Sequence, residues 1–210
     1  MKILLDNGHG EETPGKCSPV WPDGSCLREY EFARDIVRRV FDRLHARGVV
    51  AEIIVPERRD VPLYVRANRV NGICDVAGKS NCLLVSVHAN AGGGTGWEAH
   101  TYRGDSMADR YSALFYEKAE AAFGKEWRIR KGSADPSDPD WDSNFAILRD
   151  TKCPAVLTEN FFMDTERDCR FLLSEEGCER IAAMHVESMQ AMIARSEERR
   201  VGKECRKRCR

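Results

Sequence analysis

Four side chains of types that bind metal ions or move protons stand out in this sequence. They are His9 in Asp-Asn-Gly-His-Gly, Glu29 in Leu-Arg-Glu-Tyr-Glu-Phe, His88 in Val-Ser-Val-His-Ala-Asn and Glu159 in Val-Leu-Thr-Glu-Asn. Two histidines and one carboxylate form the ligand set of an open catalytic zinc site, and a second carboxylate can carry protons there. A metal-dependent hydrolase is therefore the leading interpretation.

Each of these residues has an ordinary structural explanation when it is taken alone. A single histidine after a strand is usually a hydrogen-bonded core or surface residue, and a glutamate at a helix start, such as Glu29, favours the positive end of the helix dipole. Glu159 fits this explanation less well, because it follows an apolar run and buried charges need partners. All four together require several independent coincidences, which favours one shared site.

Apolar runs and segments with helical spacing alternate along the chain, and these elements must position the four residues. The predicted strands are 2–6, 49–55, 82–87, 97–102 and 155–158, and the predicted helices are 29–47, 62–71, 106–123, 164–173 and 175–194. This alternation predicts an α/β fold, a single-domain sandwich with a mostly parallel twisted sheet flanked by helices on both faces. Because functional groups gather beyond the carboxyl ends of such strands, we expect His9, His88 and Glu159 to converge.

Composition limits the other classes of function. The chain has 210 residues, of which 42% are hydrophobic, and no apolar run approaches the roughly 18 residues that cross a bilayer. The N-terminus becomes polar too early for a signal peptide and is predicted to be the first strand. Residues 1–194 hold 25 Lys or Arg against 31 Asp or Glu, which gives no reason to expect nucleic-acid binding.

The last residues differ from the rest of the chain. Residues 195–210 contain eight Lys or Arg, and Arg-Ser-Glu-Glu-Arg-Arg-Val-Gly-Lys-Glu-Cys (195–205) looks like the translation of a common sequencing-library adapter. A basic solvated tail fits the composition equally well but does not explain this order. We therefore expect a catalytic domain over residues 1–194 and a non-native tail over 195–210, with the true C-terminus and any wall-binding domain left open.

Five segments, in order, resemble the zinc-dependent N-acetylmuramoyl-L-alanine amidases of type 3, a family of bacterial cell-wall amidases and phage endolysins. The matching segments are 3–10, 27–32, 61–71, 86–90 and 153–164. The resemblance implies hydrolysis of the amide bond between N-acetylmuramic acid and L-alanine in peptidoglycan. It also implies that His9, Glu29 and His88 bind one zinc ion and that Glu159 is the catalytic glutamate. Members usually carry Lys after the zinc-binding Glu, where this chain has Tyr30, so Glu31 is the alternative ligand.

Three further residues are expected to contact substrate. Asn90 shares the motif of His88, and Arg66 and Arg149 could place the acidic stem peptide, with ordinary ion pairs as the alternative for both arginines. Residues 124–143 offer no obvious regulatory helix. Together with the lack of a visible signal peptide, this favours a phage or prophage endolysin, a monomer made in the host cytoplasm that acts on the cell wall. A bacterial cell-wall amidase is the alternative origin.

The sequence is also compatible with two other functions. One is another zinc peptidase or amidohydrolase that cuts amides in free peptides, and the other is a catalytically inactive peptidoglycan-binding module. The presence of Glu159 argues against the second, because degenerate enzymes commonly lose the acid/base residue first. Analysis of the reaction products would separate the first from an amidase.

Overall fold

A six-stranded sheet with the strand order β2-β1-β3-β6-β4-β5 forms the centre of the protein. The computed structural model describes residues 1–104 and 106–208, with side chains up to residue 197. The strands are β1 (Lys2–Asn7), β2 (Ala51–Ile53), β3 (Cys82–Asn90), β4 (Trp97–Thr101), β5 (Trp141–Asp142) and β6 (Ala155–Phe162). Strands β2, β1, β3 and β6 are parallel, whereas β4 is antiparallel to β6 and parallel to β5. The predicted mostly parallel α/β sheet is confirmed.

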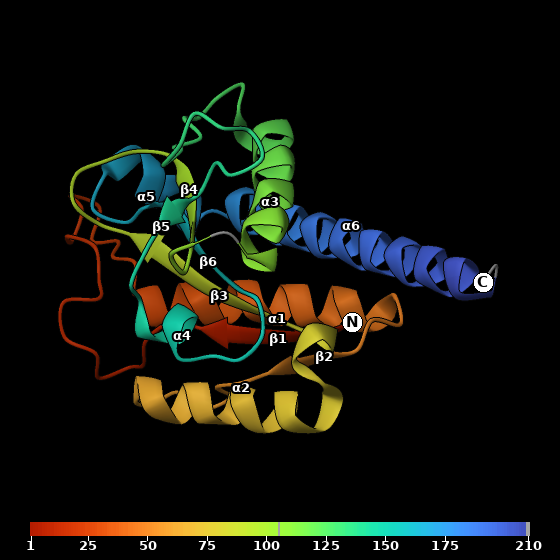
Figure 1. Ribbon diagram of the computed structural model, residues 1–210. Helices are drawn as coiled ribbons and strands as arrows, with labels where there is room; N and C mark the ends of the chain where they lie inside the picture. Colours follow the sequence, from red (N-terminus) through yellow and green to blue (C-terminus); the bar gives the residue numbers. More distant parts are fainter. Residues whose placement is uncertain (105, 209–210) are drawn as a thin grey trace.

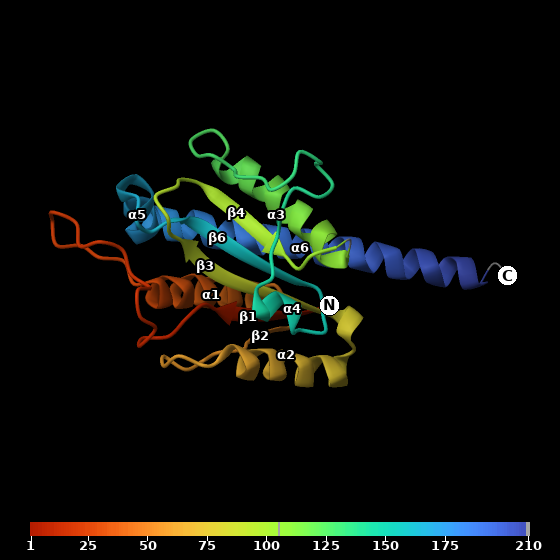
Figure 2. The ribbon, with the colours of Figure 1, turned by 60° about the vertical axis from the view of Figure 1, so that its left-hand side comes forward.

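Helices cover both faces of this sheet, as predicted. They are α1 (Glu29–Ala46), α2 (Leu63–Ala77), α3 (Met107–Phe123), α4 (Ala146–Arg149), α5 (Glu166–Leu173) and α6 (Glu175–Arg208), with one 3-10 turn, η1 (Lys79–Asn81). Helices α1, α3 and α6 pack on one face, and α2 lies on the other face with α4 (Figures 1 and 2). Helix α6 continues past residue 194, so the segment predicted to be a non-native tail extends this helix through residue 208. Within the described residues, no helix combines the length and apolar character needed to span a membrane.

Successive side chains of each strand point to opposite faces of the sheet, and this divides the apolar core into two layers. In β3, Val85 and Val87 belong to the core beneath α1, α3 and α6, whereas Leu84 belongs to the core beneath α2 and α4. Because successive side chains of a strand point to opposite faces, Ser86 and His88 lie on the same face as Leu84. The candidate ligand His88 thus points to the α2 and α4 face of the sheet.

Two strands are longer than the sequence predicts. Strand β3 continues to Asn90 and β6 to Phe162, so His88 and Glu159 lie inside strands instead of just beyond them. Their Cα atoms are direct register partners, and a bulge follows this pair, with Phe161 in a left-handed conformation (φ +61°). The difference arises because polar residues end an apolar run in the sequence without ending the strand.

Candidate metal centre and active site

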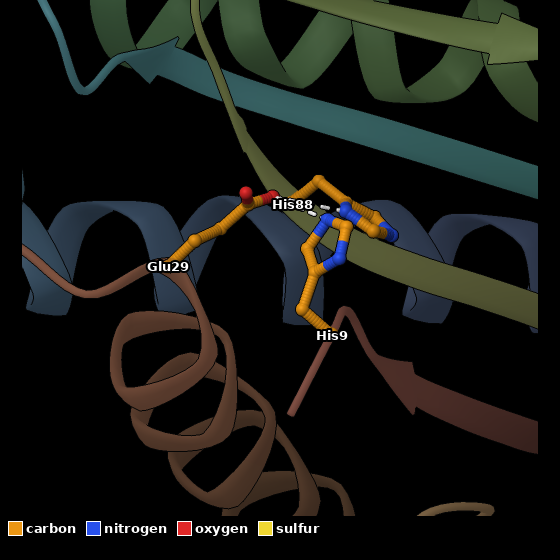
Figure 3. A group of neighbouring side chains, drawn as sticks. All are labelled: His9, Glu29 and His88. Atoms are coloured by element: carbon orange, nitrogen blue, oxygen red, sulfur yellow. Dashed lines mark hydrogen bonds and ion pairs between the residues drawn. The ribbon is translucent and has the colours of Figure 1, made fainter. Parts of the chain in front are cut away.

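His9, Glu29 and His88 converge at the carboxyl ends of β1 and β3 (Figure 3). His9 follows β1, Glu29 is the first residue of α1, and His88 projects from β3. The distance from Glu29 Oε1 is 3.3 Å to His9 Nε2 and 3.0 Å to His88 Nδ1. One donor atom from each residue lies within 4.8 Å of the other two. The structure therefore brings together the three ligands predicted from the sequence.

The turn that carries His9 needs the glycines on both sides of it. His9 has a φ of +59°, a left-handed conformation that costs energy for a residue with a side chain. A Cβ atom on Gly8 would lie 2.3 Å from the His88 ring, and one on Gly10 would lie 2.1 Å from the backbone nitrogen of Asp60. The Gly-His-Gly sequence thus allows the turn to pack directly against the second histidine.

A chain of hydrogen bonds fixes the orientation of the His88 ring. Arg66 Nη1 donates to Asp6 Oδ1 (2.9 Å), Ser86 Oγ donates to Asp6 Oδ2 (2.6 Å), and Ser86 Oγ lies 3.1 Å from His88 Nε2. The single hydroxyl hydrogen of Ser86 goes to the carboxylate, so Ser86 must accept a hydrogen from His88 Nε2. In the neutral ring, Nδ1 then presents its lone pair toward Glu29, which is the arrangement of a metal-bound imidazole.

The charge balance of the site fits a cation. Two acceptors, His88 Nδ1 and Glu29 Oε1, face each other at 3.0 Å and need a proton or a metal ion between them. Glu29 is only 1% exposed, and its second oxygen, Oε2, is buried, has no hydrogen-bond partner among the described residues and lies 3.6 Å from Lys16 Nζ. Burial alone would raise the pKa of Glu29, but its interactions with His88 and His9 outweigh this effect and lower that pKa. Two imidazoles and one carboxylate suit Zn²⁺, and this donor set leaves a coordination position open for water.

Glu159 lies on the neighbouring strand beside this group. It pairs in register with His88, and its Oε2 atom is buried and accepts no hydrogen bond from any described residue. Burial raises the pKa of Glu159 to about 8; His88 opposes this rise and Glu29 adds to it. A carboxyl group whose pKa lies near neutral pH can both accept and donate a proton, as an acid/base residue must.

The other residues expected at the site have different surroundings. Asn90 Nδ2 donates to Glu98 Oε1 (2.7 Å), one strand away from Glu159. Arg66 is 2% exposed, forms an ion pair with Asp6 and donates to the His9 carbonyl oxygen (3.0 Å), so it holds the His9 turn in place. Arg149 is exposed and pairs with Asp150. Both arginines thus make the ion pairs that the sequence left open as their alternative role.

The alternative ligand and two unpredicted residues also have clear positions. Glu31 is exposed and accepts a hydrogen bond from the Tyr30 hydroxyl, whereas Glu29 joins His9 and His88 in the candidate metal group. Two residues that were not predicted also lie here: the register of β4 places Glu98 beside Glu159, and Arg130 forms an ion pair with Glu98. Glu98 and His100 are two residues apart on the predicted strand 97–102, so their side chains point to the same face. This pattern of polar residues is the signal that could have identified Glu98 from the sequence.

The whole chain is similar to known amidases. The family model described as N-acetylmuramoyl-L-alanine amidase matches residues 3–191. An N-acetylmuramoyl-L-alanine amidase from Bacillus licheniformis, CwlM, is 33% identical over 192 residues, which cover 90% of this chain and 67% of the relative. An endolysin of Bacillus phage SPP1 is 30% identical over 197 residues, covering 91% of this chain and 65% of that protein. The chain thus spans about two thirds of the length of these relatives.

Solved structures agree with this assignment at the level of the fold. The N-acetylmuramoyl-L-alanine amidase from Clostridium difficile 630 superposes with a TM-score of 0.75 at 18% identity, covering 92% of this chain and 96% of that one. The catalytic domain of CwlV from Bacillus (Paenibacillus) polymyxa var. colistinus gives a TM-score of 0.73 at 20% identity, with coverages of 92% and 98%. With a family match that extends over nearly all of its residues, the chain belongs to the N-acetylmuramoyl-L-alanine amidase family.

Proposed function

We propose that this chain hydrolyses the amide bond between N-acetylmuramic acid and L-alanine in peptidoglycan, with one zinc ion held by His9, Glu29 and His88. The observation that carries the proposal is the convergence of three donor atoms within 4.8 Å, with His88 Nδ1 3.0 Å from Glu29 Oε1. A bound zinc ion supplies a position for water, lowers the pKa of that water and polarises the amide carbonyl group.

Glu159 is the residue proposed to move protons. As the register partner of His88, it stands beside the metal group, and its raised pKa of about 8 reflects a carboxyl group that gives up its proton reluctantly. In the reaction it accepts a proton from the attacking water and delivers it to the nitrogen of the departing L-alanine. General acid/base catalysis of this kind typically contributes about 10²- to 10⁴-fold to the rate. No serine or cysteine nucleophile is required.

The proposed setting is the bacterial cell wall, where peptidoglycan is the binding partner. Named relatives include both a bacterial amidase and a phage endolysin, so their similarity supports either a lytic phage enzyme or a bacterial cell-wall amidase. The family match ends at residue 191, which is consistent with a catalytic domain over residues 1–194 and with residues 195–210 lying outside it. We propose that the chain acts as a monomer.

Product analysis on purified peptidoglycan tests this function. We expect new L-alanine amino groups with no release of reducing sugar ends, loss of this activity with a chelator, and recovery when zinc is added. Cleavage of free peptides without release from peptidoglycan would instead identify a zinc peptidase. Binding to peptidoglycan with no bond cleaved would identify a binding module.

A further inference from the structure

The face of the sheet that carries His88 and Glu159 continues onto β4. Glu159 pairs in register with His88 on one side and with Glu98 on the other, so the three side chains point to the same face. Adjacent strands lie about 4.7–4.9 Å apart, so the Cα atoms of His88 and Glu98 are roughly 10 Å apart. The residues around Glu98 are therefore close enough to contact a substrate whose scissile bond lies at the metal group.

Glu98 is a buried carboxylate held by three donors. Asn90 Nδ2 donates to Oε1 (2.7 Å), His100 Nε2 lies 3.3 Å from the same oxygen, and Arg130 Nε donates to Oε2 (2.5 Å). Glu98 is 5% exposed, and a charge buried to this degree is tolerated only with such partners. Because protein groups satisfy both of its oxygens, Glu98 is not itself available to substrate and instead fixes the position of Arg130.

Arg130 uses only part of its hydrogen-bonding capacity in this arrangement. Its Nε atom contacts Glu98, but neither Nη1 nor Nη2 donates a hydrogen bond to any residue that the structure describes. The Cζ atom lies 5.0 Å from the centre of the Phe162 ring, and the Arg130 backbone nitrogen donates to the Trp97 carbonyl oxygen (2.8 Å). The side chain is 28% exposed. A guanidinium fixed by a carboxylate and an aromatic ring thus keeps two Nη groups free of described partners on a partly exposed side chain.

We propose that Arg130 is an anion-binding residue that anchors a carboxylate of the stem peptide on the L-alanine side of the scissile amide. The proposal rests on the proposed amidase function. Two Nη groups in one plane match the two oxygens of a carboxylate, and arginine has enough donors to bind a second carboxylate besides Glu98. An extended residue spans about 3.3–3.6 Å, so the carboxylate that we assign is the one on the second residue of the stem peptide.

Hydrolysis of two matched substrates tests this anchor. The substrates are N-acetylmuramoyl-L-alanyl-D-isoglutamyl-L-lysinamide, whose second stem residue carries a free α-carboxylate, and N-acetylmuramoyl-L-alanyl-D-isoglutaminyl-L-lysinamide, in which that group is a neutral carboxamide. The γ-carboxyl group is an amide in both, so the two substrates differ only in the α-carboxylate. We expect the unaltered protein to favour the carboxylate substrate by about 10- to 100-fold in kcat/KM, mainly through KM, since hydrogen bonds to charged groups contribute this much. Arg130→Gln should remove the preference, and Arg130→Lys should retain part of it because the charge remains and the planar fork is lost.

Matched variants separate the anchor from a structural effect. Arg128→Gln alters an exposed arginine two residues earlier and should leave the preference unchanged. Combining Glu98→Gln with Arg130→Gln leaves no buried carboxylate without its partner, so this double variant should lose the preference while keeping its zinc content and melting temperature. An undiminished preference in Arg130→Gln, or in the folded double variant, would overturn the proposal.

The outcome also distinguishes this proposal from the function on which it rests. If the unaltered protein cleaves both substrates equally, the amidase function stands and the anchor is wrong. If it cleaves neither, the amidase function fails, and calorimetry with the free peptides L-alanyl-D-isoglutamyl-L-lysinamide and L-alanyl-D-isoglutaminyl-L-lysinamide decides the anchor. Binding that needs both the carboxylate and Arg130 supports it, and equal binding of the two peptides refutes it.

Discussion

Ser86 determines which nitrogen of the neutral His88 ring carries the hydrogen, so replacing Ser86 tests how the candidate metal centre is organised. The hydroxyl donates to Asp6 Oδ2 (2.6 Å) and lies 3.1 Å from His88 Nε2. In Ser86→Ala, both interactions are lost and the ring of His88 is free to hold its hydrogen on either nitrogen. A share of the molecules then presents an N–H group toward the metal position, which opposes metal binding.

The expected loss of zinc affinity can be bounded from these contacts. Removing an outer partner of a metal-bound histidine typically weakens binding by about 10- to 100-fold, or about 1.4–2.7 kcal/mol. Asp6 keeps its ion pair with Arg66 in the variant, and Glu29 still contacts the ring of His88, so the scaffold around the ring remains. We therefore expect the lower end of the range, a loss of about 10-fold.

Competition with a chromophoric zinc chelator measures this affinity directly. Ser188→Ala is a matched control, because Ser188 is also fully buried but bonds to the Met184 carbonyl oxygen within α6. The control should bind zinc like the unaltered protein. Equal zinc affinity in the folded Ser86→Ala variant and in the unaltered protein would refute the assigned hydrogen-bond chain.

Three further predictions concern catalysis and stability. Glu159→Gln should lower kcat by about 10²- to 10⁴-fold while one zinc per chain remains bound; retained turnover would remove Glu159 from the mechanism. Burial lowers the pKa of His185 from its usual value of 6.5 to about 4. Above pH 6.5 His185 is therefore neutral in both the folded and the unfolded protein. Below that pH the unfolded chain binds a proton at His185, and the folded protein does not until the pH approaches 4. Stability should therefore fall by up to about 3 kcal/mol between pH 6.5 and 4, and His185→Gln should flatten this loss in urea unfolding; parallel pH curves would contradict the assignment. Arg66→Met should destabilise the fold by about 3–5 kcal/mol because Asp6 is left buried without its partner, and adding Asp6→Asn should restore part of the loss; a neutral effect of Arg66→Met in urea unfolding would exclude a structural role for the ion pair.

Much of the fold and the candidate metal ligands could be predicted because their signals are local. The helix from Glu29 follows from apolar residues at helical spacing, and the Gly-His-Gly turn follows directly from the end of the first apolar run. His88 interrupts a buried run with a polar side chain. Since parallel strands place their carboxyl ends at one edge of a sheet, these strand-end signals were sufficient to predict that His9, His88 and Glu159 converge, and the resemblance to the amidase family added Glu29.

The remaining features depend on pairing between strands that are distant in sequence. Nothing local shows that β4 is antiparallel to β6, and only that register places Glu98 beside Glu159. Arg130 comes from the segment after α3 and reaches Glu98 through backbone pairing with Trp97. In the same way, Arg66 resembles a surface cation in the sequence, and its burial against Asp6 is visible only in the folded protein.

Zinc content and release of L-alanine amino groups from the same peptidoglycan, measured for the unaltered protein and for His88→Ala, test the central claim most directly. We expect one zinc per chain and chelator-sensitive release for the unaltered protein, with both metal and release lost in a variant that remains folded. A folded His88→Ala variant that keeps its zinc and its activity, or a metal-free unaltered protein that still releases L-alanine amino groups, would contradict the account.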